Sequence, residues 1–154
     1  AIEYFEHLRR TLKLEANHEE IALGWNAILA GEITQTLNDI QMLKSNLPCF
    51  AFTNSNPTHQ TTWTAAYPRL FSVFNRIFIS SELGLRKPDH AAFDAIAQAI
   101  GINKSAMLFF DDSLQNIEGA LSAGLQTVHV RTPADIRQAL ESISKTSLTP
   151  VNKL

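Results

Sequence analysis

The sequence has little cysteine and no long apolar run, and each shortage excludes a class of protein. Its 154 residues include one cysteine, Cys49, so an internal disulfide framework and zinc sites of the Cys₄ or Cys₂His₂ kind are excluded. Apolar stretches all fall short of the roughly 18 residues of a membrane-spanning helix, so we expect no membrane partner. A single cysteine suits a reducing compartment, and we predict a cytoplasmic location.

The sequence also lacks an excess of charge of either sign. Thirteen Lys and Arg residues against 15 Asp and Glu residues give a formal net charge of −2. Broad binding to a phosphate backbone needs a basic surface, so we expect no nucleic-acid partner. A hydrophobic content of 45% with 18% charged residues is typical of a globular protein.

From residue 33 onward, helical patterns alternate with short apolar runs. Candidate strands cover 49–52, 76–79, 107–110 and 127–130, and candidate helices cover 33–43, 89–100 and 114–123, with a last helix from 132. Short, fully apolar strands that alternate with helices indicate a parallel sheet that is covered on both faces. We therefore predict an α/β fold, a Rossmann-like parallel sheet with helices on both faces.

The first thirty residues carry helical patterns and no strand signal. Asn17 and Glu20 have the spacing of a capping box and predict the start of a second helix, which we expect to end at Gly31. Two helices cannot enclose a core by themselves. We therefore expect this helical pair to pack on another part of the protein.

Polar side chains follow three of the predicted strands, at the edge where ligands bind in such sheets. Thr53 and Asn54 end the first run, Lys87 lies in the loop after the second, and Asp111-Asp112 ends the third. Adjacent carboxylates repel each other, and a Mg²⁺ ion would relieve that repulsion. Together, a hydroxyl, an ammonium and a metal carboxylate would neutralise a phosphoryl group.

Each of these residues also has a simpler interpretation. Asp112 or Ser113 could only cap the helix that follows, and Lys87 could be a solvated loop lysine. The ordered set of three, each after its own strand, favours a phosphoryl site over three unrelated surface residues.

Three segments of the chain resemble motifs II, III and IV of the haloacid dehalogenase-like hydrolases. They are FTNSNPTHQTTW, ISSELGLRKPDHAAFDAI and FFDDSLQNIEGALSAGLQTVHV. The resemblance is to the subgroup with a small helical cap, and within it to sugar-phosphate phosphatases of the α-D-glucose-1-phosphate phosphatase type. It implies that residues 1–31 are a remnant of the helical cap and that residues 32–154 form the α/β core.

The resemblance assigns catalytic and metal-binding roles residue by residue. Thr53 would bond a phosphoryl oxygen, helped by the backbone N–H of Asn54. Lys87 would balance the charge of the phosphoryl group and of the nucleophile. Asp112 would bind Mg²⁺, and Asp111 would bind it through water or orient Asp112.

The same resemblance gives supporting roles to four further residues. Asn116 would hold the metal loop in shape. His59 and Trp63 fall where the family places substrate-contacting side chains, with local packing as the alternative for both. Trp25 is expected to pack inside the cap.

The family's first motif, an Asp-x-Asp at the end of the central strand, has no counterpart among the six aspartates of this sequence. The resemblance therefore places the nucleophile, the general acid, one metal ligand and the central strand in an N-terminal segment of the same protein, which we predict as a partner. Without that strand, unmade backbone hydrogen bonds would cost roughly 1–3 kcal/mol each, so we expect that the chain does not fold alone as a simple deletion. Strand exchange with a neighbouring chain and a degenerate gene product are the alternatives.

The predicted function is that of a Mg²⁺-dependent phosphatase of a small phosphorylated metabolite, a sugar phosphate, through an aspartyl-phosphate intermediate. We expect the 154-residue chain alone to be inactive. The alternative is a non-catalytic anion-binding module or pseudoenzyme. A dehalogenase is disfavoured because the acidic pair suits a metal, and a phospho-receiver domain is disfavoured because its acidic pair comes early in the chain.

Overall fold

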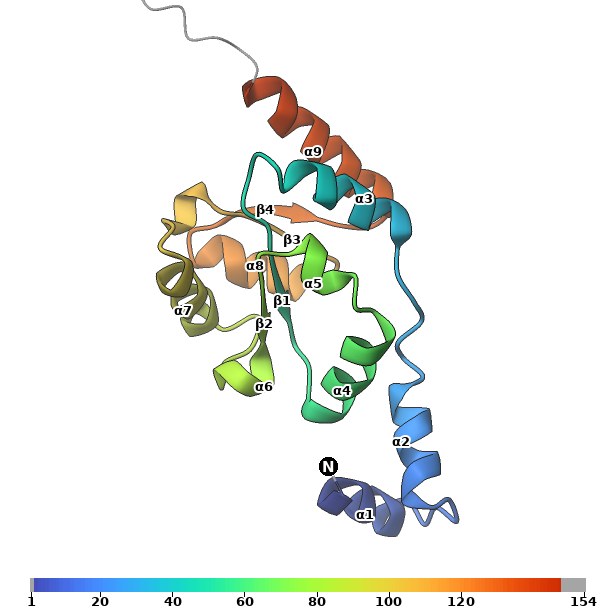
Figure 1. The fold of residues 1–154 in the computed structure, drawn as a ribbon. Coiled ribbons are helices and arrows are strands. Elements are labelled where there is room, and N and C mark those ends of the chain that lie inside the picture. Colours follow the sequence, from blue (N-terminus) through green and yellow to red (C-terminus); the bar gives the residue numbers. More distant parts are fainter. Residues whose placement is uncertain (1, 148–154) are drawn as a thin grey trace, which may run out of the picture.

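The computed structural model describes residues 2–147 as helices and short strands in alternation (Figure 1). In chain order the elements are α1 (Ile2–Thr11), α2 (His18–Asn26), α3 (Thr34–Leu43), β1 (Phe50–Thr53), α4 (Pro57–Ala66), α5 (Leu70–Val73), β2 (Arg76–Ile79), α6 (Ser80–Leu83), α7 (His90–Ile100), the 3₁₀ helix η1 (Lys104–Ala106), β3 (Leu108–Asp111), α8 (Leu114–Ser122), β4 (Gln126–His129) and α9 (Pro133–Ser147). All four predicted strands are present within a residue of their expected bounds. The α/β class is therefore confirmed.

The described strands form two parallel pairs. β1 pairs with β2, with Phe50 opposite Arg76, and β3 pairs with β4, with Leu108 opposite Gln126. β1 and β3 do not share a ladder. In Figure 1, β1 and β2 run down the view whereas β3 and β4 run across it. The edges of β1 and β3 that face away from their partners are therefore unpaired within residues 2–147.

A phenylalanine of α7 joins the two strand pairs. Phe93 is 2% exposed, and its ring meets that of Phe52 on β1 at 6.2 Å and that of Phe109 on β3 at 5.3 Å, both edge to face. Ala120, Ala123 and Leu125 complete the buried cluster around it. Burial of these aromatic and aliphatic groups is the main apolar contribution that holds the pairs together.

The N-terminal helices begin as predicted, but the second one ends early. The Asn17 side chain accepts hydrogen bonds from the N–H groups of Glu19 and Glu20, and Glu20 returns a bond to the Asn17 N–H, which confirms the capping box. The predicted end at Gly31 is wrong because the Ala27 N–H already bonds to the Gly24 carbonyl in a tighter turn. Gly31, with a φ of 126°, lies in the connection to α3.

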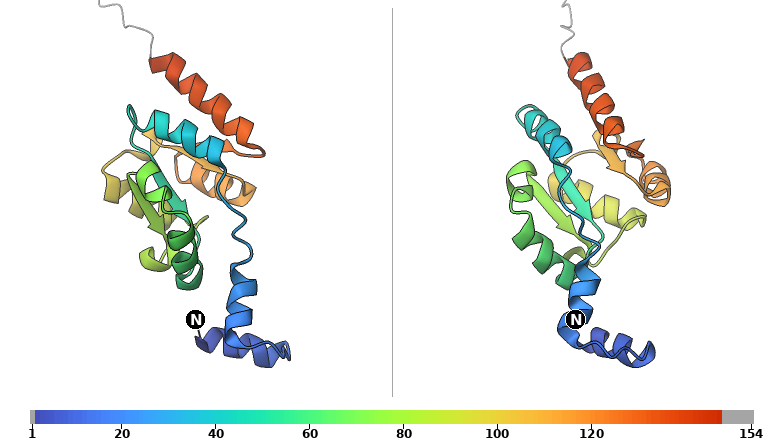
Figure 2. Two further views of the ribbon diagram at one scale, coloured as in Figure 1. Left: turned by 45° about the vertical axis from the view of Figure 1, so that its right-hand side comes forward. Right: turned by 90° about the vertical axis from the view of Figure 1, so that its right-hand side faces the viewer.

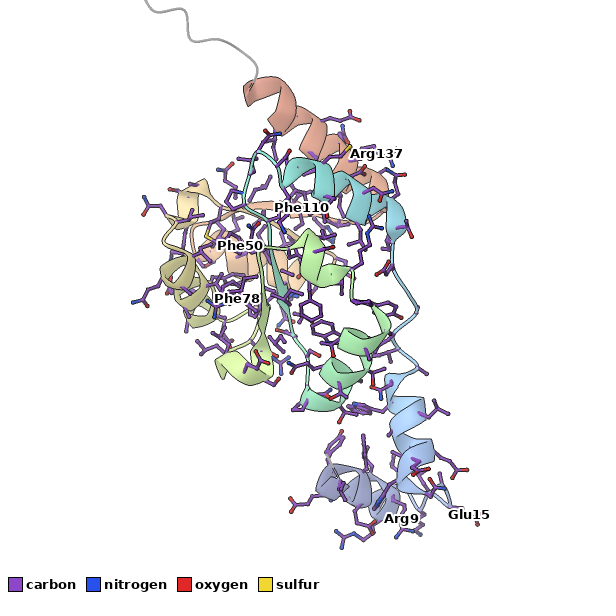
Figure 3. All side chains as sticks on the ribbon, in the orientation of Figure 1. Arg9, Glu15, Phe50, Phe78, Phe110 and Arg137 are labelled. Atoms are coloured by element: carbon purple, nitrogen blue, oxygen red, sulfur yellow. The ribbon has the colours of Figure 1, made fainter. Side chains whose placement is uncertain are left out.

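Two long-range helix contacts frame the core (Figure 2). Helix α2 lies against α4 below the strands, and α3 lies beside α9 above them. Arg137 of α9, marked in Figure 3, reaches the Asp39 carboxylate of α3 with an Nε–Oδ2 distance of 3.4 Å. Among the described helices none is both long enough and apolar enough to cross a lipid bilayer.

Candidate active site

The candidate site is centred on the side chain of Lys87, which spans from β1 to β3. Its Nζ donates to the carbonyl oxygen of Phe52 at 2.9 Å and to Oδ2 of Asp111 at 2.7 Å. It also lies 5.4 Å above the ring of Phe52 and 5.6 Å above that of Phe109. Its side chain is 11% exposed, so Lys87 is not the solvated loop lysine of the simpler interpretation.

The loop that carries Lys87 is fixed from two sides. The Asn54 amide donates to the Lys87 carbonyl at 2.9 Å and accepts from the Lys87 N–H at 3.0 Å. The peptide bond from Lys87 to Pro88 is cis. On the other side, a Cβ placed on Gly119 of α8 would lie 2.4 Å from the Pro88 carbonyl oxygen, so only a glycine admits this close approach. Asn54 and Gly119 therefore position Lys87.

The carboxylate of Asp111, at the end of β3, is buried and fully engaged. Oδ1 accepts from the Ser113 N–H and from the Asn116 amide, both at 2.9 Å, and Oδ2 accepts from Lys87. Burial opposes ionisation, but the hydrogen bonds from Lys87, Asn116 and Ser113 outweigh it and hold the pKa of Asp111 below its ordinary value. Asp111 is thus an ionised residue that fixes the loop after β3.

A carboxyl whose pKa is lower in the folded state stabilises the fold above its unfolded pKa, about 4 for aspartate. This contribution is lost as the pH falls through the folded pKa. We expect the difference in unfolding free energy between the wild type and Asp111→Asn to be largest near neutrality and to shrink below about pH 4. Urea unfolding at several pH values measures it. A difference that stays constant with pH would contradict the role given to the charge of Asp111.

Asp112 and Thr53 occupy the same edge as Lys87. Asp112 is exposed, and its backbone carbonyl oxygen accepts from Nε2 of His129 at 3.1 Å. Thr53 is the half-buried last residue of β1. The structure thus brings Lys87 against Asp111, with Asp112 as the next residue. The phosphoryl and metal roles of these residues stay predictions.

The residues of this edge supply few metal ligands. Residues 2–147 hold no group of three or more His, Cys, Asp or Glu side chains arranged around a metal position. Both oxygens of Asp111 are already bonded, whereas Asp112 presents an exposed carboxylate. Because Mg²⁺ uses few carboxylates together with water and phosphate oxygens, the edge fits one protein ligand to Mg²⁺.

Ser113 does not cap α8 with its side chain, and neither does Asp112, the other residue proposed for that role. The N–H of Ser113 instead bonds to Asp111. Asn116 lies in the first turn of α8 and donates to the same carboxylate, which agrees with a loop-supporting position.

His59 and Trp63, the predicted substrate contacts, lie on α4 and have different surroundings. Trp63 is 7% exposed, stacks on Phe71 at 6.1 Å and points Nε1 at the Ser55 hydroxyl. His59 stacks on Trp25 of α2 at 5.5 Å. Trp63 is thus packed in the interior, and His59 lies at the contact between α2 and α4. Their substrate roles stay predictions.

Sequence reasoning did not find two positions that shape this edge. The Ser80 hydroxyl after β2 accepts from the Ser55 N–H at 3.0 Å and donates to the Ser55 carbonyl at 3.1 Å, which ties the loops after β1 and β2 together. The sequence places Gly119 inside the predicted helix 114–123 and assigns it no further role. A serine directly after an apolar run was the available signal for Ser80, whereas Gly119 gave none.

Comparison with known proteins identifies a family and several relatives of this chain. A family model described as haloacid dehalogenase-like hydrolase matches residues 1–124. Phosphatase MT3486 of Mycobacterium tuberculosis (strain CDC 1551 / Oshkosh) is 27% identical over 142 residues, 90% of this chain and 64% of that protein. Pyrimidine 5′-nucleotidase PynA of Streptococcus pneumoniae is 34% identical over 89 residues, 56% of this chain and 37% of that protein. The chain therefore spans less than two thirds of the length of either relative.

Among solved structures, the fold is similar to that of the wild-type HAD family enzyme BT-2542 from Bacteroides thetaiotaomicron, in complex with magnesium and inorganic phosphate. The TM-score is 0.76 at 23% sequence identity, over 84% of this chain and 68% of that one. At this identity the likeness establishes the shared fold.

Proposed function

Because the chain belongs to the haloacid dehalogenase-like hydrolases, we propose that it forms most of a Mg²⁺-dependent phosphatase that acts on a small phosphorylated sugar. The observation that carries the proposal is Lys87, an ammonium held between two strand ends beside Asp111 and next to the exposed Asp112. Relatives named as a phosphatase and a 5′-nucleotidase support a phosphomonoester substrate. The lone cysteine supports a cytoplasmic location.

In the proposed mechanism, Thr53 and the backbone N–H of Asn54 bond the phosphoryl oxygens, and Lys87 balances their charge. Asp112 would hold Mg²⁺, which neutralises phosphoryl charge when bound. Asp111, engaged by three donors, keeps Lys87 and the loop that bears Asp112 in place. An aspartate nucleophile would attack the phosphorus and expel the hydroxyl group of the sugar, and water would then hydrolyse the aspartyl-phosphate to inorganic phosphate and the free carboxylate.

We propose that an extended segment of the same protein, bearing Asp-x-Asp, lies between β1 and β3 and supplies that nucleophile. The unpaired edges of these strands support it, since an added parallel strand would bond both. So does the greater length of the relatives. On this proposal the 154-residue chain alone is inactive.

Asp112→Asn is expected to lower Mg²⁺-dependent hydrolysis of a generic phosphomonoester by about a hundredfold or more, because an amide replaces the charged metal ligand. The assay uses the protein as the cell makes it, at its measured intact mass. Asp94→Asn, on an exposed face of α7, is the matched control and should leave the rate unchanged. Undiminished hydrolysis by Asp112→Asn would contradict the metal role, and phosphate binding without hydrolysis in the wild type would favour the anion-binding module.

A further inference from the structure

The backbone of the loop after β3 is held by β4 on both sides of Asp112. Before Asp112, the Asp111 carbonyl oxygen accepts from the Val130 N–H at 2.9 Å, which continues the pairing of the two strands. After it, the carbonyl oxygen of Asp112 accepts from Nε2 of His129 at 3.1 Å. A backbone carbonyl oxygen can only accept, so Nε2 of His129 carries the proton in this bond. The two peptide groups that flank Asp112 are thus bonded to one strand.

The Asp112 carboxylate depends on this backbone for its direction. Asp112 is exposed, and within residues 2–147 no hydrogen bond or ion pair reaches its carboxylate. By contrast, three donors fix the carboxylate of Asp111. A metal ligand binds more tightly when surrounding groups already orient it, since less conformational freedom is lost on binding. The bond from His129 therefore adds to the strand pairing in orienting the ligand proposed for Mg²⁺.

We infer that His129 is a positioning residue for Mg²⁺ binding, which holds the peptide group that follows Asp112 and does not itself touch the metal. Its Nε2 is engaged by the carbonyl oxygen, and within residues 2–147 no cluster of three or more His, Cys, Asp or Glu side chains surrounds a metal position. This inference rests on the proposed function, because it takes Asp112 as the Mg²⁺ ligand. It adds a residue of β4 to the site.

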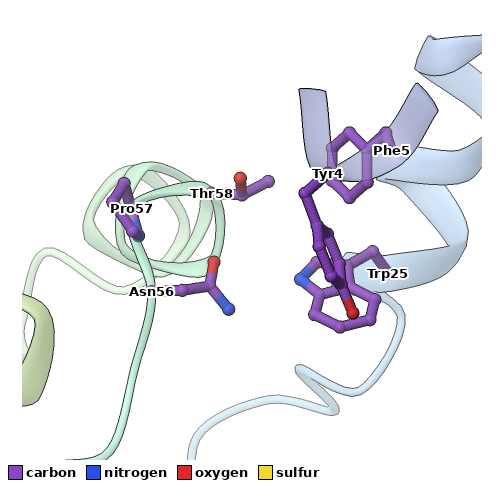
Figure 4. Close-up of a pocket in the computed structure, with 6 residues that line it drawn as sticks. All are labelled: Tyr4, Phe5, Trp25, Asn56, Pro57 and Thr58. Carbon is purple, nitrogen blue, oxygen red and sulfur yellow. The ribbon is translucent and has the colours of Figure 1, made fainter. Parts of the chain in front are cut away.

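The surroundings of His129 leave room for other side chains. His129 lines a cavity of about 320 Å³ at the carboxyl end of β4 and the start of α9, together with residues such as Arg131 and Gln138. A side chain of another shape at position 129 can therefore be placed without crowding the core. Among the described residues that line the aromatic pocket drawn in Figure 4, none belongs to β3, β4 or the loop after β3. Substitutions of His129 thus leave the walls of that pocket unchanged.

Two amides of different length test the bond to Asp112. The side-chain nitrogen of glutamine lies as many bonds from Cβ as Nε2 of histidine, whereas that of asparagine matches Nδ1. His129→Gln can therefore still donate to the Asp112 carbonyl oxygen, and His129→Asn cannot reach it. His129→Met has the length of glutamine without a donor and should behave as His129→Asn does, so the test does not depend on one variant.

The affinity for Mn²⁺, which takes the same oxygen ligands as Mg²⁺, gives a readout without turnover. We expect His129→Asn and His129→Met to bind Mn²⁺ about ten times more weakly than the wild type or weaker still, and His129→Gln to bind it as the wild type does. Electron paramagnetic resonance of free Mn²⁺ measures the affinity, in the absence of substrate, on the protein as the cell makes it.

Gln126→Leu is the matched control on the same strand. The Gln126 side chain also donates to a backbone carbonyl oxygen, that of Ser105, at 2.8 Å, but from the opposite end of β4. This substitution removes a comparable bond without touching the loop after β3, so the Mn²⁺ affinity should stay unchanged. Urea unfolding at neutral pH verifies that every variant is folded under the conditions of the binding measurement.

The outcomes separate this inference from the proposed function. Equal Mn²⁺ affinities of the wild type, His129→Asn and His129→Met would overturn the inference and leave Asp112 as a metal ligand. Equal weakening by His129→Gln and His129→Asn would also overturn it, because the imidazole itself and not its hydrogen bond would then be required. A wild type that binds no Mn²⁺ would reject the metal role of Asp112, and the inference with it.

Discussion

Lys87→Met is expected to lower the free energy of unfolding by about 3–5 kcal/mol, the cost of removing one partner from a buried ion pair. The substitution keeps much of the apolar stem but removes the ammonium. The Asp111 carboxylate, 6% exposed, then loses its counter-charge, and the Phe52 carbonyl loses a donor. Because Lys87 also spans β1 and β3, its loss weakens the only described polar link between these strands at this edge. Urea unfolding at neutral pH measures the change.

Lys104→Met is the matched control for this prediction. Lys104 also pairs with an aspartate, Asp94, but this pair is not buried. The side chain of Lys104 is 32% exposed and that of Asp94 is 57% exposed. Exposed ion pairs contribute about 1 kcal/mol or less, so the control should unfold almost as the wild type does. Equal effects of the two substitutions would show that burial of the Lys87–Asp111 pair has no bearing on its contribution.

Gly119→Val is expected to lower the free energy of unfolding by about 1–3 kcal/mol. A Cβ at this position would lie 2.4 Å from the Pro88 carbonyl oxygen and 2.7 Å from Pro88 Cβ. Since backbone atoms cannot move aside as a flexible side chain does, either α8 or the Lys87 loop must shift. Thermal unfolding measures the loss of stability, and hydrolysis by the active protein reports the shift of Lys87.

Gly24→Val provides the matched comparison for Gly119→Val. Gly24 is also a helical glycine, and a Cβ there meets nothing within 4 Å. Replacing a helical glycine at an open position changes stability by well under 1 kcal/mol and in the favourable direction. A Gly119→Val protein as stable as Gly24→Val would contradict the close approach of α8 to Pro88.

The sequence predicted the strands well because a change from apolar to polar residues marks where several of them end. β1 and β3 are apolar up to a polar last residue, Thr53 and Asp111, and β2 is followed at once by Ser80. Helix α4 was not predicted, since PTHQTTWTAA has four threonines and little apolar periodicity. It forms because Asn56 caps it, Pro57 starts it, and Trp63 is buried against the core. The Asn56 cap and Pro57 can be recognised in the sequence, whereas the burial of Trp63 cannot.

The candidate site was predictable in its outline only. The order of polar residues after successive strands placed Lys87 near Asp111, because parallel strands end at one edge. The hydrogen bond from Lys87 to the Phe52 carbonyl and the approach of Gly119 to Pro88 depend on contacts between segments more than 30 residues apart. No local pattern records such contacts. Thr53, Asn54, Asp112, His59 and Trp63 keep their roles as predictions.

The pairing of α3 with α9 bears on the order in which the chain assembles. Paired positions are 26 residues apart in β1 and β2 and 18 apart in β3 and β4, so each parallel pair closes a short loop and can form as soon as its own segment is made. The contact between Arg137 and Asp39 spans 98 residues. Helix α3 can contact α5 earlier, through the hydrogen bond from Arg69 to Asn38. On the ribosome, only the side of α3 that faces α9 would stay uncovered until the last helix emerges.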